Sequence, residues 1–252
     1  MKVDIITLHA VQNYGSALQA FATQEIFKQH GCDVTIINYV RENVRPENLL
    51  KTWSKGNLMK AVVIFPTIVR WRKVFTRFIQ EHLNISDKVY TSEEDFTTYP
   101  LTADAYCTGS DQVWNSQWNK GILPCLYLSF VPKECYKFSF AASFGQSHLD
   151  EDEVLKTKPY LDEYRKISVR EDSAVEILEK QYLIKNSVHL VDPTLCVSGD
   201  FWRQYGTPRK IKEDYILIYN LNRSKAFDRY AVELAKRTGL KLVRFCTRYD
   251  QF

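Results

Sequence analysis

The sequence predicts an α/β fold in which helices flank a parallel sheet, and three observations support this prediction. Short apolar runs rich in β-branched residues alternate with amphipathic helical runs along the 252 residues. The first β-α-β unit joins its strands through a helix, the kind of connection that parallel pairing requires. An apolar content of 45% with 13% aromatic residues excludes a disordered chain.

The N-terminal elements follow from local pattern. Residues 3–8 form an apolar run typical of a strand, and residues 34–38 form a second one. Between them, residues 15–30 predict a helix that ends before Gly31, a common residue at helix C-termini. Its apolar face is spaced at helical intervals by Leu18, Phe21, Ala22 and Ile26.

The next segment is less regular. Residues 41–67, which contain Pro46, Gly56 and Pro66, predict an irregular insertion with some helix. Residues 71–82 then predict an amphipathic helix, whose other side carries Arg70, Arg72, Lys73 and Arg77. Such a basic side is usually only solvated, but it also suits a phospholipid surface or a lipid-linked substrate. We expect at most peripheral membrane contact.

The remaining pattern predicts further alternation and a second domain. Strands are expected at 103–108, 137–142, 166–169 and 187–191, with helices at 150–165 and 171–182. A charged segment with Pro208, residues 206–213, predicts a linker. Beyond it lie a strand at 214–219, a helix at 225–237 and a strand at 241–245. The domains are therefore expected at 1–205 and 214–252.

Charge and cysteine content restrict the possible partners and compartment. Thirty-four Lys and Arg against 30 Asp and Glu give a net charge of +4, too balanced to predict a nucleic-acid partner. The acidic start Met1-Lys2-Val3-Asp4 lacks the apolar core of a signal peptide. Six scattered cysteines form no CxxC pair, so we expect free thiols, no metal, no cofactor and a cytoplasmic protein.

Polar segments follow five of the predicted strands, just past their carboxyl ends. In open α/β sheets this edge is where ligands bind, so these segments are the candidate binding residues. They contain Asn13, Gly15 and Ser16; Gly109, Ser110, Asp111, Trp114 and Asn115; Ser143 and Gly145; Arg170 and Glu171; and Asp192.

Each segment also has a purely structural interpretation. Gly15 either allows a tight turn or opens a helix whose free amides bind an anion. Asp111 either caps a short helix, with Trp114 and Trp118 in the core, or joins aromatic rings in a saccharide-binding surface. Asp192-Pro193-Thr194 also fits a simple turn.

Arg170 and two histidines are the candidates for charge chemistry. A guanidinium at the strand end can hold a carboxylate or phosphate, although an ion pair with Glu171 or another carboxylate is the alternative. Ser168 and Glu171 have the spacing of a capping box. His9 and His148 are the candidate acid–base groups, because both lie near the predicted ligand edge.

These segments together resemble the polysaccharide pyruvyl transferase family. The blocks that carry the resemblance are 13–20 (NYGSALQA), 109–115 (GSDQVWN), 141–145 (AASFG), 168–171 (SVRE) and 192–195 (DPTL). They occur in the family's order and span residues 1–205.

The resemblance implies two Rossmann-like halves, similar to a GT-B fold, and a specific transfer reaction. Pyruvyl would pass from phosphoenolpyruvate to a sugar of a cell-surface polysaccharide precursor, such as capsule or exopolysaccharide, as a ketal. Arg170 fits the donor-binding cation, while Asn13, Gly15 and Ser16 fit the cleft floor. Asp111, Trp114 and Asn115 would support the site or the acceptor, which could be lipid-linked.

The family also implies an acid–base histidine in a Ser-Phe-His-Gly-like block, which this sequence lacks. We therefore expect a chain that lacks the C-terminal half, with an incomplete second domain and little or no activity alone. Two alternatives remain: a GT-B glycosyltransferase using a nucleotide-sugar, and a non-catalytic sugar-binding or interaction module.

Overall fold

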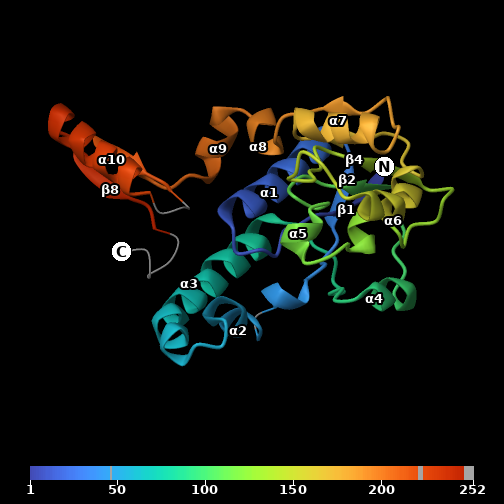
Figure 1. The fold of residues 1–252 in the computed structure, drawn as a ribbon, viewed down its shortest axis with the longest axis horizontal. Coiled ribbons are helices and arrows are strands. Elements are labelled where there is room, and N and C mark those ends of the chain that lie inside the picture. Colours follow the sequence, from blue (N-terminus) through green and yellow to red (C-terminus); the bar gives the residue numbers. More distant parts are fainter. Residues whose placement is uncertain (46, 221–223, 247–252) are drawn as a thin grey trace. The chain divides into compact units, whose positions relative to one another are not determined.

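The structure is a computed structural model that describes residues 1–45, 47–220 and 224–246 (Figure 1). The described residues form two compact units, one of Met1–Leu49 with Trp71–Ser198 and one of Leu50–Arg70 with those from Gly199 on. The first unit thus ends at Ser198, whereas the sequence places the linker at 206–213. The domain limits proposed from the sequence stay a prediction.

A parallel sheet is the centre of the first unit, as predicted. Within the described residues it contains β1 (Lys2–Ile6), β2 (Asp33–Ile36), β3 (Ala105–Thr108) and β4 (Tyr136–Ser139), in the order β2-β1-β3-β4. A parallel pair, β5 (Ser168–Val169) and β6 (Val188–His189), continues beside β4. There Ala142 donates its amide to the Ser168 carbonyl at 3.1 Å, and Arg170 donates to the Ala142 carbonyl at 2.9 Å.

Both faces of this sheet are covered, which explains why β1 is apolar on both sides. Val3 and Ile5 pack on one face in a cluster with Phe27 and Phe138. Ile6 joins the larger cluster on the other face. The four residues Val3–Ile6 are all buried.

Helices complete the first unit. They are α1 (Tyr14–Gln29), α4 (Glu93–Thr98), α5 (Ser116–Asn119), α6 (Glu151–Leu161), α7 (Asp172–Lys180) and α8 (Pro193–Cys196), with single 3-10 turns at Glu42–Val44 and Pro124–Tyr127. α7 contacts β5 and β6, while α1 contacts β2 and α8. The predicted helices at 15–30, 150–165 and 171–182 are confirmed within a few residues at each end.

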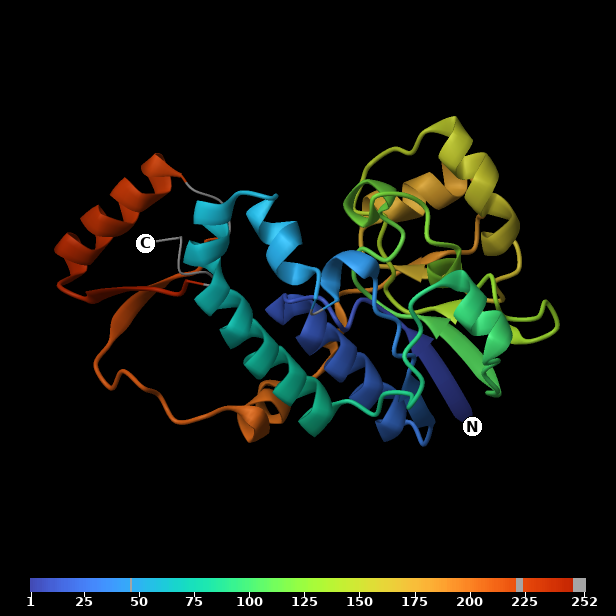
Figure 2. The ribbon, with the colours of Figure 1, turned by 90° about the horizontal axis from the view of Figure 1, so that it is seen from below.

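The helix predicted at 71–82 is confirmed but is longer than expected. It begins at Leu58 and continues to His82 as α3, with Pro66 inside it (Figure 2). The expectation of an irregular segment through residue 67 was therefore wrong from Leu58 on, and α2 (Leu49–Ser54) precedes it. Asn57 starts α3 by accepting a hydrogen bond from the Lys60 amide at 2.9 Å.

The C-terminal half of α3 packs on α1 through aromatic rings. Phe75 lies 5.1 Å from Tyr14 between ring centroids, and Phe78 lies 5.8 Å from Phe21. This is the apolar face that the sequence pattern indicates.

The second unit contains α2, the start of α3 and a smaller parallel pair. β7 (Tyr215–Ile218) pairs with β8 (Lys241–Arg244), joined by α10 (Lys225–Thr238), and α9 (Gly199–Tyr205) precedes them. These match the predicted strand, helix and strand. Among the described residues, no helix combines the length and apolar character that crossing a bilayer requires.

Candidate functional site

The order β2-β1-β3 creates a switch point at the carboxyl ends of β1 and β3. From β1 the chain crosses to β2, and it then returns past β1 to form β3. The loops after β1 and β3 therefore depart in opposite directions and leave a crevice between them, the usual ligand position in such sheets. The loop after β1 leads through Asn13 to Ser16 in the first turn of α1, and Gly109–Asp111 lie in the loop after β3.

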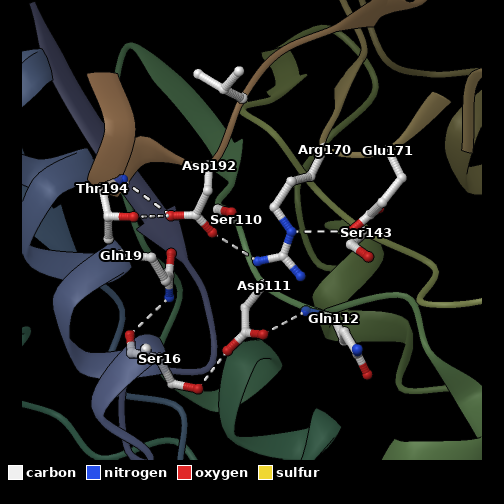
Figure 3. Close-up of polar contacts among 12 residues, drawn as sticks. Ser16, Gln19, Ser110, Asp111, Gln112, Ser143, Arg170, Glu171, Asp192 and Thr194 are labelled. Atoms are coloured by element: carbon white, nitrogen blue, oxygen red, sulfur yellow. Dashed lines mark hydrogen bonds and ion pairs between the residues drawn. The ribbon is translucent and has the colours of Figure 1, made fainter. Parts of the chain in front are cut away.

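One hydrogen bond links the two loops. Ser16, in the first turn of α1, donates its hydroxyl to Asp111 Oδ2 at 2.5 Å (Figure 3). The other oxygen, Oδ1, accepts the Gln112 amide at 2.8 Å. Asp111 has φ +83°, an unusual backbone conformation for a residue other than glycine. Its carboxylate is therefore held in a defined direction.

The N-terminus of α1 is capped by the chain itself. Asn13 Oδ1 accepts the amides of Gly15 at 2.8 Å and Ser16 at 3.3 Å. An anion that bound these amides would have to displace the Asn13 side chain, so the free amide groups expected from the sequence are already bonded.

Gly15 is not required by the turn. It lies within α1 with no positive φ, and among the described residues an added Cβ would meet only Asn13 Oδ1, at 3.2 Å. The interpretation of Gly15 as a glycine needed for turn geometry therefore finds no support. A hydrogen in place of a side chain instead leaves the first turn of α1 open to solvent.

Gly109 and Ser110 bring the β3 loop close to β1. A Cβ on Gly109 would lie 3.1 Å from both Ile5 Cγ2 and Thr7 Cβ. Thr7 donates its hydroxyl to the Ser110 carbonyl at 2.7 Å. The Ser110 hydroxyl itself is buried without a hydrogen-bond partner among the described residues. These two residues thus position Asp111.

Asn115, Gln112 and Gly145 form a second polar group next to Asp111. Asn115, rather than Asp111, caps the short helix α5, because its Oδ1 accepts the Trp118 amide at 2.9 Å. Its amide donates to Gln112 Oε1 at 3.0 Å. Gly145 has φ +62°, and its amide donates to the Ser143 hydroxyl at 3.0 Å.

The two tryptophans of this region have different environments. Trp114 is buried, donates its indole N–H to the Leu126 carbonyl at 3.1 Å, and stacks on Tyr127. Trp118 is 59% exposed. Of the two rings, Trp118 is the one that a ligand can reach directly.

A pocket of about 300 Å³ lies over the switch point. Its lining residues are Leu8, Val11, Asn13, Ser16, Asp111, Gln112 and Trp118. An exposed indole beside a carboxylate and two amide side chains suits a saccharide, whose C–H faces stack on rings and whose hydroxyls need acceptors and donors. Asp111 is the titratable side chain in this lining.

Arg170 lies beside this pocket in a cluster of carboxylates. Its Nε donates to Glu171 Oε1 at 3.0 Å and its Nη1 to Asp192 Oδ2 at 2.9 Å (Figure 3). Burial lowers the pKa of the guanidinium, but Glu171, Asp111 and Asp192 outweigh this effect and raise it. Arg170 therefore forms the ion pair with Glu171 or another carboxylate that the sequence left open as an alternative. Its Nη2 group has no hydrogen-bond partner within the described residues.

Asp192 both stabilises the turn that begins α8 and forms an ion pair with Arg170. Its Oδ1 accepts the Thr194 amide at 3.0 Å and the Thr194 hydroxyl at 2.7 Å, so it caps α8. The capping box proposed for Ser168 and Glu171 is not formed, because Ser168 bonds Ser139 instead and Glu171 makes no side-chain cap.

The two candidate histidines lie apart from the pocket lining. His9 is buried and contacts the Thr7 carbonyl at 3.4 Å and Asn38 Oδ1 at 3.3 Å. Burial lowers the pKa of His9, more than these contacts raise it, so the neutral ring is favoured. His148 is exposed ahead of α6. Their roles in acid–base chemistry stay predictions.

Sequence reasoning missed a second cation near Asp111. Arg41 is buried and bonds Asn119 through Nη1 and Oδ1. Burial lowers the pKa of Arg41, while the fields of Tyr39 and Asp111 raise it. Arg41 follows the carboxyl end of β2, as Arg170 follows the carboxyl end of β5. The position past a strand end that indicates Arg170 as a candidate therefore indicates Arg41 as well.

The structure therefore gathers most of the predicted binding residues at one edge of the sheet. Asn13, Ser16 and Asp111 line the pocket, and Arg170, Glu171 and Asp192 form the neighbouring ion cluster. Among the described residues, no group of three or more His, Cys, Asp or Glu side chains is arranged to hold a metal ion.

Comparison with known proteins identifies a family. No curated protein and no solved structure matches the chain. A family model, described as polysaccharide pyruvyl transferase, matches residues 13–251. The family implies a transferase of polysaccharide biosynthesis that acts on a saccharide. The match begins at the Asn13 segment of the pocket and covers nearly the whole chain, which therefore belongs to the polysaccharide pyruvyl transferase family.

Proposed function

We propose that this protein transfers a pyruvyl group from phosphoenolpyruvate to a saccharide in the cytoplasm, with the pocket at the β1–β3 switch point as the acceptor site. The observation that carries the proposal is the pairing of Ser16 with Asp111 in that pocket, with two arginines nearby. The acceptor is a polysaccharide precursor such as one for capsule or exopolysaccharide, and a lipid-linked form would fit the same chemistry.

The reaction converts an enol phosphate ester into a ketal. A proton adds to the methylene carbon of the donor, which becomes a methyl group and leaves a cation-like centre at the ketal carbon. Two sugar hydroxyls bond to that carbon, the bond to phosphate oxygen breaks, and phosphate leaves. The two sugar hydroxyls lose two protons in total. One balances the proton that adds to the methylene carbon, and the other balances the proton that the leaving phosphate takes up.

Asp111 is the base for a hydroxyl in this proposal. Its carboxylate lines the pocket, and the Ser16 hydroxyl and Gln112 amide hold it in place. A positioned carboxylate accepts a proton from an attacking hydroxyl without further rearrangement. Trp118 and Asn13 would orient the sugar ring against it.

Arg170 and Arg41 are the cations for the donor. Arg170 Nη2 is free of partners among the described residues, and Glu171 and Asp192 fix the direction of its guanidinium. Both arginines lie in the field of Asp111. The donor's carboxylate and phosphate are negatively charged, and in the transition state they would lie close to the carboxylate of Asp111. Cations beside them would offset the repulsion between these negative charges.

The proton donor lies outside the pocket lining. His9 is buried with a lowered pKa, and His148 is exposed elsewhere. We infer that a further segment, such as the second half of a GT-B-like fold, supplies the acid across the pocket, and that this chain alone has low activity. A Rossmann-like half that binds substrates but lacks the acid fits both inferences.

A non-catalytic sugar-binding module is the second candidate. It is favoured by Arg170 itself, whose guanidinium already bonds two carboxylates of the chain. A saccharide would then bind at Trp118 and Asp111 without any donor.

Ligand-induced shifts in melting temperature test these alternatives. We expect phosphoenolpyruvate to raise the melting temperature of the wild type and nucleotide-sugars to leave it unchanged. Arg170→Lys, which keeps the charge but loses the planar fork, should abolish the shift. Arg203→Lys, in an ion pair with Asp200 outside the first unit, is the matched control.

Three other results have clear meanings. A shift with nucleotide-sugars alone would favour a glycosyltransferase. A shift with saccharides alone, unaffected by Arg170→Lys, would favour the binding module. Rapid phosphate release from phosphoenolpyruvate and a saccharide by this chain would contradict the missing acid and make His148→Ala the next variant to assay.

A further inference from the structure

The N-terminal half of α3 exposes an unusual amount of apolar surface. The side chains concerned, here named the α3 apolar face, are Leu58 (80% exposed), Met59 (82%), Val62 (69%), Val63 (55%), Phe65 (55%) and Val69 (52%). Single exposed apolar residues are common on proteins, but six within three turns of one helix form a patch that marks a binding surface.

Helical geometry separates this face from the buried one. At 100° per residue, Leu58, Val62, Phe65 and Val69 fall within about 60° of each other on one side. Ile64 and Ile68, which are buried, lie about 90–130° away from the centre of this stripe. Apart from Lys60 and Thr67, this half of α3 is apolar, and its outer side stays exposed among the described residues.

Cations surround the apolar face. Residues 48–80 contain no Asp or Glu but seven basic residues, so the other 219 residues carry 27 cations against 30 anions. The basic residues are Lys51, Lys55, Lys60, Arg70, Arg72, Lys73 and Arg77. Arg70, Arg72 and Lys73 are exposed on the turns of α3 that directly follow Val69.

We propose that the α3 apolar face and its flanking cations dock this protein on the surface of an anionic phospholipid membrane. The apolar side chains would enter the boundary between headgroups and acyl chains, while the arginines and lysines bind lipid phosphates. The apolar stretch 58–69 has 12 residues, which suits a helix lying in the plane of the interface.

Charge argues for this partner over a second copy of the chain. A symmetric contact through the α3 apolar face would bring the seven cations of each copy together, and no acid within residues 48–80 would compensate them. An anionic lipid surface has the complementary charge and also the apolar layer.

This docking surface is independent of the proposed transferase activity. The face and cations at 51–70 belong to the second unit, and the pocket belongs to the first. A failure of membrane binding would therefore leave the pocket's function untouched, and the reverse also holds.

Vesicle flotation of the whole chain tests the proposal. We expect binding to vesicles of phosphatidylcholine with 30–40% phosphatidylglycerol, little binding to phosphatidylcholine alone, and at least a fivefold loss in 0.5 M NaCl. Two variants separate the components: Val62→Ser with Phe65→Ser removes apolar contact, and Arg70→Glu with Arg72→Glu and Lys73→Glu reverses charge. Each should lower the partition coefficient at least tenfold.

Matched controls use exposed residues elsewhere. Leu155→Ser removes an exposed leucine (71%) from α6, and Arg229→Glu with Lys236→Glu and Arg237→Glu reverses three cations of α10. Both should bind as the wild type does. Melting temperatures of all variants should stay near that of the wild type, because every mutated side chain is exposed.

Four results would overturn the proposal. The first is the absence of binding to anionic vesicles. The second is equal binding by the α3 variants and the wild type, and the third is equal loss in the α10 control. The fourth is a stable dimer in solution that Val62→Ser with Phe65→Ser converts to monomer, because a second copy would then cover the face.

Discussion

Ser16 Oγ donates a hydrogen bond to Asp111 Oδ2 at 2.5 Å across 95 residues of sequence. The bond joins the first turn of α1 to the loop after β3, on the two sides of the switch point. The hydroxyl is the donor, so it holds one oxygen of the Asp111 carboxylate in place.

Ser16→Ala should weaken both the fold and ligand binding. Loss of one hydrogen bond to a carboxylate should lower the free energy of unfolding by about 1–2 kcal/mol in urea titrations. Saccharide affinity should fall because Asp111 can then rotate away from the pocket. Ser116→Ala is the control, since Ser116 donates to Glu153 at 2.7 Å outside the pocket lining. Equal loss of affinity in both variants would contradict a binding role for the Ser16–Asp111 pair.

Gly15→Ala should separate folding from binding. Alanine in a helical position gains about 0.5–1 kcal/mol over glycine, and the 3.2 Å approach to Asn13 Oδ1 offsets part of this gain. The melting temperature should therefore stay the same or rise. Ligand affinity should fall severalfold, because the methyl group faces the open first turn of α1. A variant that loses stability and keeps full affinity would show that Gly15 serves only the fold.

Gly145→Ala should destabilise the site more than a glycine substitution elsewhere. Gly145 has φ +62°, and a Cβ there would lie 2.5 Å from Asn115 Nδ2. Gly31 has φ +77°, but no described atom lies within 4 Å of a Cβ built there, so Gly31→Ala measures the backbone cost alone, about 1–2 kcal/mol. Chemical denaturation should show a larger loss for Gly145→Ala, because Asn115 must move and uncap α5. Equal losses would mean that Asn115 moves freely.

Asp4→Asn should remove a pH dependence of stability. Asp4 is buried in β1, and neither of its carboxylate oxygens has a hydrogen bond to any residue that the structure describes. Lys2 Nζ lies 3.9 Å from Oδ1. Burial raises the pKa of Asp4 to about 6, an effect that Lys2 reduces and Asp33 increases.

The sign of the effect follows from that raised pKa. The folded chain holds the proton between about pH 4 and 6 while the unfolded chain releases it, so this contribution to stability is lost as pH rises through 6. Its size is about 3 kcal/mol for two pKa units. Urea titrations at pH 4.5 and 8 should show about 2 kcal/mol of this loss in the wild type and less in Asp4→Asn. Identical pH profiles would contradict the assignment.

The main elements of the fold could be predicted from the sequence because each carries a local signal. The strands at β1, β2 and β3 are apolar and β-branched, and α10 has amphipathic spacing with Gly239 at its end. The start of α3 could not be predicted in this way. A proline such as Pro66 normally ends a helix, and a stretch with apolar residues on nearly every side shows little helical periodicity.

The candidate site could be predicted in part, because the carboxyl ends of parallel strands meet at one edge. From this rule we could predict that Ser16, Asp111 and Arg170 lie at the same edge of the sheet. It could not show that Asn13 already bonds the amides of α1, or that Trp114 is buried while Trp118 is exposed. These outcomes depend on side-chain directions, which are set by packing between segments far apart in sequence.

The position of β1 between β2 and β3 has a consequence for how the chain is made. β1 can pair with β2 soon after both strands have been synthesised. Val3 can pair with Ala105 only after β3 has left the ribosome. At a synthesis rate of about 5–20 residues per second, the 68 residues between Ile36 and Ala105 take about 3–14 s. During that delay one edge of an apolar strand is unpaired in the nascent chain. Chaperone capture of translation intermediates should therefore be strongest before Thr108 emerges and fall once β3 has joined the sheet.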